Sequence, residues 1–234
     1  MRGKDEMSAS WAVSALTWWE EAGVDVIVGE EPRDWLNSKA KGATAEPAAP
    51  PPDALPATVE GFQAWLLETD QIPFASSSAP RTAAAGDPAA GLMVMTDMPS
   101  AEGGLISGAA GGLFDRMLAA IGRGRDSIYL APLSPIRIPT GTIADKDAAR
   151  LAEIARHHIG LVAPRALLLF GDTCGKALVG SAVSGARARW HEIQTGAGPI
   201  KTLVTIRPEK LVDRPAFKKF VWEDLQMLME ELKP

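Results

Sequence analysis

ALLLFGDTCGKALVG, residues 166–180, is the part of this sequence that decides its fold. Five apolar residues in a row are followed by Gly-Asp, and a short segment of helix-forming residues comes next. A strand that is apolar at every position is buried on both faces, which is typical of parallel strands covered by helices. We therefore expect a buried strand over 166–172 and a short helix over 174–180.

The surrounding sequence repeats this alternation of strands and helices. Apolar strands are predicted at 91–97, 127–133 and 201–206, and helices at 111–122, 145–162 and 214–233. The pattern predicts an α/β fold, a three-layer α/β/α sandwich with a mostly parallel central sheet. Ligands of such sheets bind beyond the carboxyl ends of the strands. The predicted site is therefore built from the loops 96–104, 131–139, 171–176 and 205–210.

The sequence predicts three parts. Residues 1–38 form a helical extension with aromatic residues at helical spacing, and its aromatic face is expected to pack or to hold a protein partner. Residues 39–57 are rich in Ala and Pro and are expected to be a linker. Residues 58–234 form the α/β domain, which begins with a helix at 58–69 and an irregular stretch to about residue 90.

Composition excludes several classes of protein. The chain of 234 residues has one cysteine and three histidines, too few for a disulfide framework or a cage of cysteine ligands. We expect no metal site. No apolar run reaches about 18 residues and no apolar signal segment is present, so we expect a cytoplasmic protein without a membrane partner.

Charge is distributed unevenly along the chain. Residues 1–110 hold 6 Lys and Arg against 16 Asp and Glu, whereas residues 111–222 hold 17 against 9. A locally basic region suits a phosphate-binding face, because Lys and Arg displace the counterions of a nucleic-acid backbone. Scattered surface arginines that only solvate helices are the alternative interpretation.

Several sequence stretches within residues 58–233 occur in an order and at a spacing that can be compared with those of a known family. They are GAAGGLFDRMLAAIG (108–122), SIYLAPLSPIRIPTG (127–141), LVAPRALLLFGDTCGKALVG (161–180) and VTIRPEKLVDRP (204–215). In this order and spacing the chain resembles bacterial uracil-DNA glycosylases of the family-4 type, which carry an iron–sulfur cluster. Thr205 to Pro215 match the family's second motif without a gap, and Trp222, Asp224 and Leu225 match its last helix. The resemblance implies a glycosylase-like fold, base excision in DNA repair, and DNA as a partner.

The residues at the family's pocket positions differ. The first motif reads Thr96-Asp97-Met98-Pro99-Ser100, so the resemblance makes Asp97 the carboxylate that orients water and places Met98 and Pro99 in the base pocket. The aromatic that stacks on uracil falls on Ile106, and the asparagine that reads its edge falls on Pro132. The histidine of the second motif falls on Arg207.

These replacements change the chemistry. Pro132 has no side-chain donor or acceptor, and Ile106 lacks the stacking face that contributes about 1–3 kcal/mol per base in single-strand binders. Arg207 is a permanent cation that suits an anionic leaving group or a phosphate. For Asp97, capping of nearby N–H groups is the structural alternative. Arg137, Lys210 and Arg214 are the predicted DNA-binding residues.

The cluster positions of the family are apolar. They align with Ile72, Ala75, Ile136 and Leu151, so we expect no iron–sulfur cluster and no other cofactor.

Three hypotheses follow. The first is a divergent superfamily member that binds DNA and has lost or altered base excision. The second is an active DNA glycosylase for uracil or another damaged base, with Asp97 and Arg207 as catalytic residues. The third is a scaffold that holds a protein partner through residues 8–36.

An unrelated small-molecule site at the same strand ends is a further alternative. GDTCGK (171–176) lacks the spacing of a nucleotide-binding P-loop. Cys174, near the start of the predicted helix, is either a thiol of lowered pKa or a small buried residue.

Overall fold

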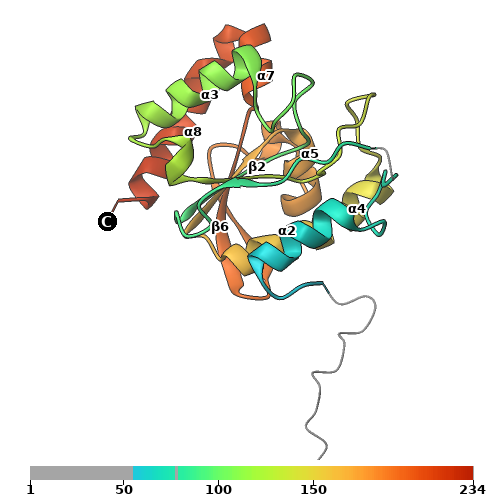
Figure 1. The fold of residues 1–234 in the computed structure, drawn as a ribbon. Helices are drawn as coiled ribbons and strands as arrows, with labels where there is room; N and C mark the ends of the chain where they lie inside the picture. Colours follow the sequence, from blue (N-terminus) through green and yellow to red (C-terminus); the bar gives the residue numbers. More distant parts are fainter. Residues whose placement is uncertain (1–54, 77–78, 234) are drawn as a thin grey trace, which may run out of the picture. The chain divides into compact units, whose positions relative to one another are not determined.

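The computed structural model describes residues 55–76 and 79–233 of the chain (Figure 1). The predicted helical extension (1–38) and most of the predicted linker (39–57) lie outside the described residues. The described part carries the strands and helices of the predicted α/β domain. No helix in these two ranges is long and apolar enough to cross a membrane.

The centre of the domain is a six-stranded sheet with the strand order β1-β3-β2-β4-β6-β5. Strands β3, β2, β4 and β6 are parallel, and the edge strands β1 and β5 are antiparallel to their neighbours. In the middle of the sheet, Leu168 of β4 pairs with Val94 of β2 and with Leu203 of β6. The strands are β1 (Ala85–Gly86), β2 (Leu92–Thr96), β3 (Tyr129–Pro132), β4 (Ala166–Phe170), β5 (Trp190–Thr195) and β6 (Gly198–Thr205). The predicted, mostly parallel sheet is confirmed.

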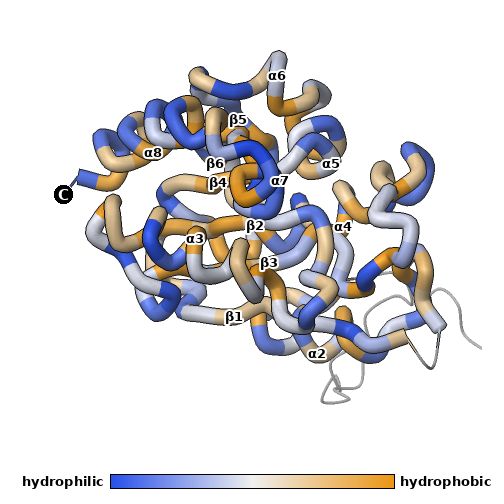
Figure 2. The backbone as a smooth tube through the Cα atoms, turned by 90° about the horizontal axis from the view of Figure 1, so that it is seen from above, coloured by the Kyte–Doolittle hydropathy of each residue, from blue (hydrophilic) through white to orange (hydrophobic). Residues whose placement is uncertain are grey.

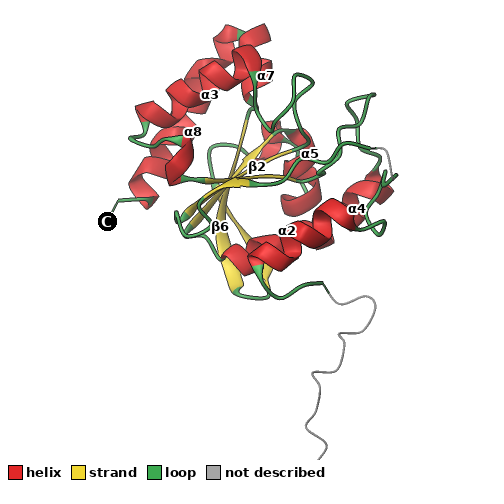
Figure 3. Cartoon of the chain, viewed as in Figure 1, coloured by secondary structure: helices red, strands yellow, loops and turns green. Residues whose placement is uncertain are grey.

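Helices cover both faces of the sheet (Figures 1 and 3). One face carries α3 (Gly108–Ala120) and α8 (Lys218–Glu231), and the other carries α2 (Val59–Glu68) and α4 (Asp145–Val162). Shorter helical segments join these layers: η1 (Arg125–Ser127), α5 (Asp172–Cys174), the π-helical η2 (Gly175–Val179), α6 (Val183–Ala186), α7 (Pro208–Asp213) and η3 (Pro215–Phe217). The predicted three-layer α/β/α sandwich is therefore observed.

The core lies on the central strands. Every residue of β2, β3 and β4 is buried, which explains why these strands are apolar without alternation. Figure 2 shows this concentration of hydrophobic residues along the middle of the sheet. The rigid sheet holds the strand ends, and thus the loops that follow them, in fixed positions.

Two edge strands are absent from the sequence prediction. In β5 only Ile193 is buried, so the strand lacks the apolar run of a central strand. It forms a hairpin with β6 across Gly196 and Ala197, and β6 therefore begins at Gly198 instead of residue 201. The two-residue β1 pairs with β3 by only Ala85 and Gly86.

The segment after β6 also differs from the prediction. The sequence pattern predicts a loop here, but residues Pro208–Asp213 form the helix α7. Pro208 occupies the first turn, where its fixed φ favours a helix and its missing N–H leaves no bond unmade. The last helix is separated from α7 by η3, so α8 begins at Lys218 and not at residue 214.

Candidate functional site

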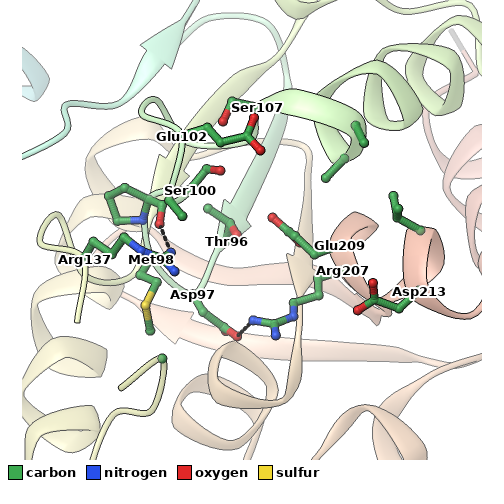
Figure 4. Close-up of a pocket in the computed structure, with 16 residues that line it drawn as sticks. Thr96, Asp97, Met98, Ser100, Glu102, Ser107, Arg137, Arg207, Glu209 and Asp213 are labelled. Atoms are coloured by element: carbon green, nitrogen blue, oxygen red, sulfur yellow. Dashed lines mark hydrogen bonds and ion pairs between the residues drawn. The ribbon is translucent and has the colours of Figure 1, made fainter. Parts of the chain in front are cut away.

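A cavity of about 320 Å³ lies beyond the carboxyl ends of the parallel strands (Figure 4). It is lined by the loop 96–102, by the start of α3, by Arg137 and Gly141, and by α7 with Arg207 before it. We call it the first cavity. Its size is in the range of pockets for small ligands such as a nucleobase.

A second cavity of about 570 Å³ adjoins the first. It is lined by the turn 171–173, by Lys176, and by the cationic residues Lys210 and Arg214. Several residues line both cavities, among them Asp97, Arg207 and Asp213. The two cavities therefore form one continuous depression at the strand ends.

Asp97 lies at the junction of the two cavities and is only 5% exposed. Its Oδ1 accepts a hydrogen bond of 2.8 Å from the backbone N–H of Cys174, and the side chains of Cys174 and Thr173 also bond to it. Burial raises the pKa of Asp97, against the opposing effect of these hydrogen bonds and of Arg207. The carboxylate thus caps the turn after β4 while it faces the cavities, so the capping and chemical interpretations of Asp97 are compatible.

Arg207 follows β6 directly and meets Asp97 across the site. Its guanidinium nitrogen lies 3.9 Å from Asp97 Oδ2, although 110 residues separate the two in the chain. The Arg207 side chain is 45% exposed, so water screens this ion pair. Arg207 is therefore held near Asp97 and remains accessible to a ligand.

Gly171 allows this close arrangement. Its φ is +97°, and a Cβ at this position would lie 2.5 Å from Asp97 Oδ2. Its N–H donates to the carbonyl of Thr205, 3.1 Å away, which joins the end of β4 to the end of β6. Only glycine satisfies both the backbone conformation and the approach of the carboxylate.

Helix α7 divides its charges between the two cavities. Glu209 lines the first cavity and Asp213 lines both, whereas Lys210 and the adjacent Arg214 line only the second. Residues four apart share one face of a helix, which explains both pairs. The second cavity is lined by four cations and three carboxylates, and the first by four carboxylates and two guanidiniums.

A comparison with models of protein families identifies the family of this chain. The model of the Uracil DNA glycosylase superfamily matches residues 83–226, which include both cavities and the whole sheet. The chain belongs to the uracil DNA glycosylase superfamily. The fold, with parallel strands that end at one site, agrees with this membership.

In this superfamily member, most predicted site residues lie at the two cavities. Met98 and Pro99 line the first cavity together with Arg137, whose guanidinium donates a hydrogen bond of 2.8 Å to the carbonyl of Pro99 (Figure 4). Ile106 and Pro132 are buried and are not among the residues that line it.

Other residues of the site were missed by the sequence analysis. Glu102, Ser107, Glu209 and Asp213 all line the first cavity. The Oγ of Ser107 and the Oε2 of Glu209 are buried and have no hydrogen-bond partner in the described part of the chain. The four-residue spacing of Glu209 and Asp213 was a usable signal, but it depends on a helix where the sequence pattern indicates a loop.

Cys174 is a buried structural residue. It is fully buried, and burial, followed by the nearby Asp97, raises the pKa of its thiol well above the usual value. The interpretation as a small buried residue is confirmed, and the interpretation as a thiol of lowered pKa is wrong.

The four positions predicted from the sequence to align with cluster cysteines lie in apolar surroundings. Ile72 and Ile136 belong to a core cluster with Phe62, and Ala75 packs against the cluster. Leu151 is fully buried in the main core. None of these side chains carries an atom that binds iron.

Proposed function

We propose that this protein is a DNA-binding member of the uracil DNA glycosylase superfamily, descended from the family-4 type, with base excision altered away from uracil. The observation that carries the proposal is the pair of adjoining cavities, of which the first has more carboxylates than cations and the second has more cations than carboxylates. Double- or single-stranded DNA presents its phosphates to such a surface. When a nucleotide is flipped out, it also presents a base. The second cavity suits the phosphates and the first suits the base.

The cations of the second cavity support DNA binding. Lys176, Lys210 and Arg214 line it with Arg207, and none of the first three forms an ion pair with a described residue. Unpaired Lys and Arg bind phosphates and release counterions. Arg137 and Arg207 extend this cationic surface to the mouth of the first cavity.

The replacements at the positions aligned with the family's pocket residues favour altered excision, although Pro132 and Ile106 are buried and do not line the first cavity. Pro132 has no amide to read the edge of uracil, and Ile106 has no aromatic face. Asp97 and Arg207 nevertheless lie 3.9 Å apart and face the cavity, an arrangement that suits a water-orienting carboxylate with an electrostatic partner. This geometry favours a changed substrate over a site without chemistry.

We further propose that the protein works without an iron–sulfur cluster. The apolar residues at Ile72, Ala75, Ile136 and Leu151 support this, because aliphatic side chains offer no thiolate to iron. The protein-scaffold alternative rests on residues 8–36, which lie outside the described residues.

The test uses labelled single-stranded and duplex oligonucleotides that each contain a single deoxyuridine. After incubation with the full-length protein, one portion is treated with alkali and another is run on a native gel. We expect a salt-sensitive shift and no cleavage above a uracil-free control. Cleavage at deoxyuridine would show that uracil excision is retained, and the absence of any shift would contradict DNA binding.

A further inference from the structure

Glu209 brings one unsatisfied carboxylate oxygen into the first cavity. Its Oε2 is buried and has no hydrogen-bond partner in the described residues, and Figure 4 shows the side chain pointing into the cavity. Glu209 is half-buried, and an acceptor atom that is buried without a partner is costly, so a ligand with a donor or a positive charge relieves that cost. The unsatisfied Oγ of Ser107 lines the same cavity and offers the ligand a second polar contact.

The charge of the whole cavity points in the same direction. Its walls carry the carboxylates of Asp97, Glu102, Glu209 and Asp213 against the guanidiniums of Arg137 and Arg207. Arg207 is paired with Asp97, and Arg137 donates to the carbonyl of Pro99. The remaining carboxylates have no cation in an ion pair within the described ranges, so the first cavity favours a positively charged occupant.

From this geometry, and resting on the proposed function, we propose that the first cavity receives a cationic nucleobase, such as a purine alkylated on a ring nitrogen. Glu209 accepts a hydrogen bond from the base or faces its positive charge. The cations of the second cavity hold the flanking phosphates at the same time. Helix α7 supplies residues to both contacts, with Glu209 on one face and Lys210 on the next.

The chemistry of such a base fits the residues present. When the bond from sugar C1′ to the base nitrogen breaks, its electron pair moves to the base, which leaves as a neutral molecule. Water adds to C1′ and releases one proton to the solvent. Because no negative charge develops on the base, the site needs no residue to stabilise an anionic leaving group, and carboxylates around the base are not repelled.

The experiment measures bases released from methylated DNA. Duplex DNA treated with dimethyl sulfate is incubated with the full-length protein, and free 7-methylguanine and 3-methyladenine are quantified by chromatography and mass spectrometry. A protein-free sample gives the spontaneous release. We expect release above this background, and no release of uracil from deoxyuridine-containing DNA.

Variants test the role of Glu209. Glu209→Gln keeps the shape and removes the charge, and we expect a loss of about 10- to 100-fold in release, the range for losing a hydrogen bond to a charged group. Asp213→Asn provides a second variant on the same face of α7. Glu192→Gln, on the exposed edge strand β5, is the control that retains full release. A thermal melt verifies that each variant is folded.

The outcomes separate this proposal from the proposed function. A salt-sensitive DNA shift without release of methylated purines overturns the cationic base and leaves DNA binding intact. Release that is equal in wild type, Glu209→Gln and Asp213→Asn also overturns it. Absence of both shift and release contradicts the proposed function as well.

Discussion

The hydroxyl of Thr205 donates a hydrogen bond of 2.6 Å to the fully buried carboxylate of Asp224. Asp224 lies on α8 and Thr205 ends β6, two residues before Arg207. The carbonyl of Thr205 in turn accepts the N–H of Gly171. The last helix therefore fixes both strand ends on which the site is built.

Asp224→Ala should destabilise the fold strongly. The carboxylate also accepts bonds from the guanidinium of Arg187, at 3.2 Å, and from the N–H of Ala188, at 3.1 Å. Removing one partner of a buried ion pair costs about 3–5 kcal/mol. Urea denaturation should show this loss, whereas Glu223→Gln should cost less than about 1 kcal/mol because that partner of Arg187 is exposed. Equal losses in both variants would contradict the role given to Asp224.

Gly171→Ala should disturb the site and the fold together. A positive φ and the approach of Asp97 both oppose a Cβ here, and such backbone strain costs about 1–3 kcal/mol. Gly196→Ala is the matched control, because a Cβ added there would meet nothing within 4 Å and the φ of Gly196 is not positive. Thermal melts of the two variants should differ clearly, and similar melting temperatures would show that Gly171 is not required.

Stability should fall in mild acid because of His158. Its Nε2 lies 2.8 Å from the hydroxyl oxygen of Tyr129, which accepts a hydrogen bond from Gln63. In its neutral form the buried ring is able to accept a hydrogen bond from the O–H of Tyr129. Burial, with a smaller effect from His157, lowers the pKa of His158 from 6.5 to about 4. The unfolded chain binds the His158 proton more tightly than the folded chain does. The stability that the neutral ring contributes is therefore present above pH 6.5 and is lost as the pH falls towards 4.

The size of this effect can be measured with His158→Gln. Between about pH 7.5 and about pH 5 the wild type should lose about 2 kcal/mol through His158, at 1.36 kcal/mol per pKa unit. Urea denaturation at the two pH values gives the loss for each protein. The variant should show a smaller pH dependence, and an unchanged dependence would exclude His158 as its source.

The strands and the location of the site could be predicted from the sequence for a physical reason. Strands buried on both faces are mainly apolar, so β2, β3, β4 and the buried second half of β6 are recognisable, and parallel strands end at one edge. Asp97 and Arg207, at the ends of β2 and β6, are thus expected to meet. The edge strand β5 escapes prediction because one face of an edge strand is solvated and its sequence is mixed.

The division of charge on α7 could not be predicted. Whether Glu209 or Lys210 faces the first cavity depends on the residue at which the helix begins, and Pro208 is as typical of a loop as of a helix start. A shift of one residue rotates each side chain by about 100° around the helix axis. The composition of a pocket is therefore less predictable than its place in the fold.

The proposed function depends above all on DNA binding by the cations beside the first cavity. The most direct test is the affinity for labelled duplex DNA, measured by fluorescence anisotropy over a series of salt concentrations. For the wild type, log Kd should rise linearly with the logarithm of the salt concentration. Lys210→Gln and Arg214→Gln should each reduce the slope of this line by about 0.9. The control is Lys233→Gln. Lys233 is exposed, and its backbone carbonyl accepts a hydrogen bond from Arg165, which lies just before β4. Lys233 therefore lies at the end of the strands opposite the two cavities. Binding without salt dependence, or variants that match this control, would contradict DNA binding through Lys210 and Arg214.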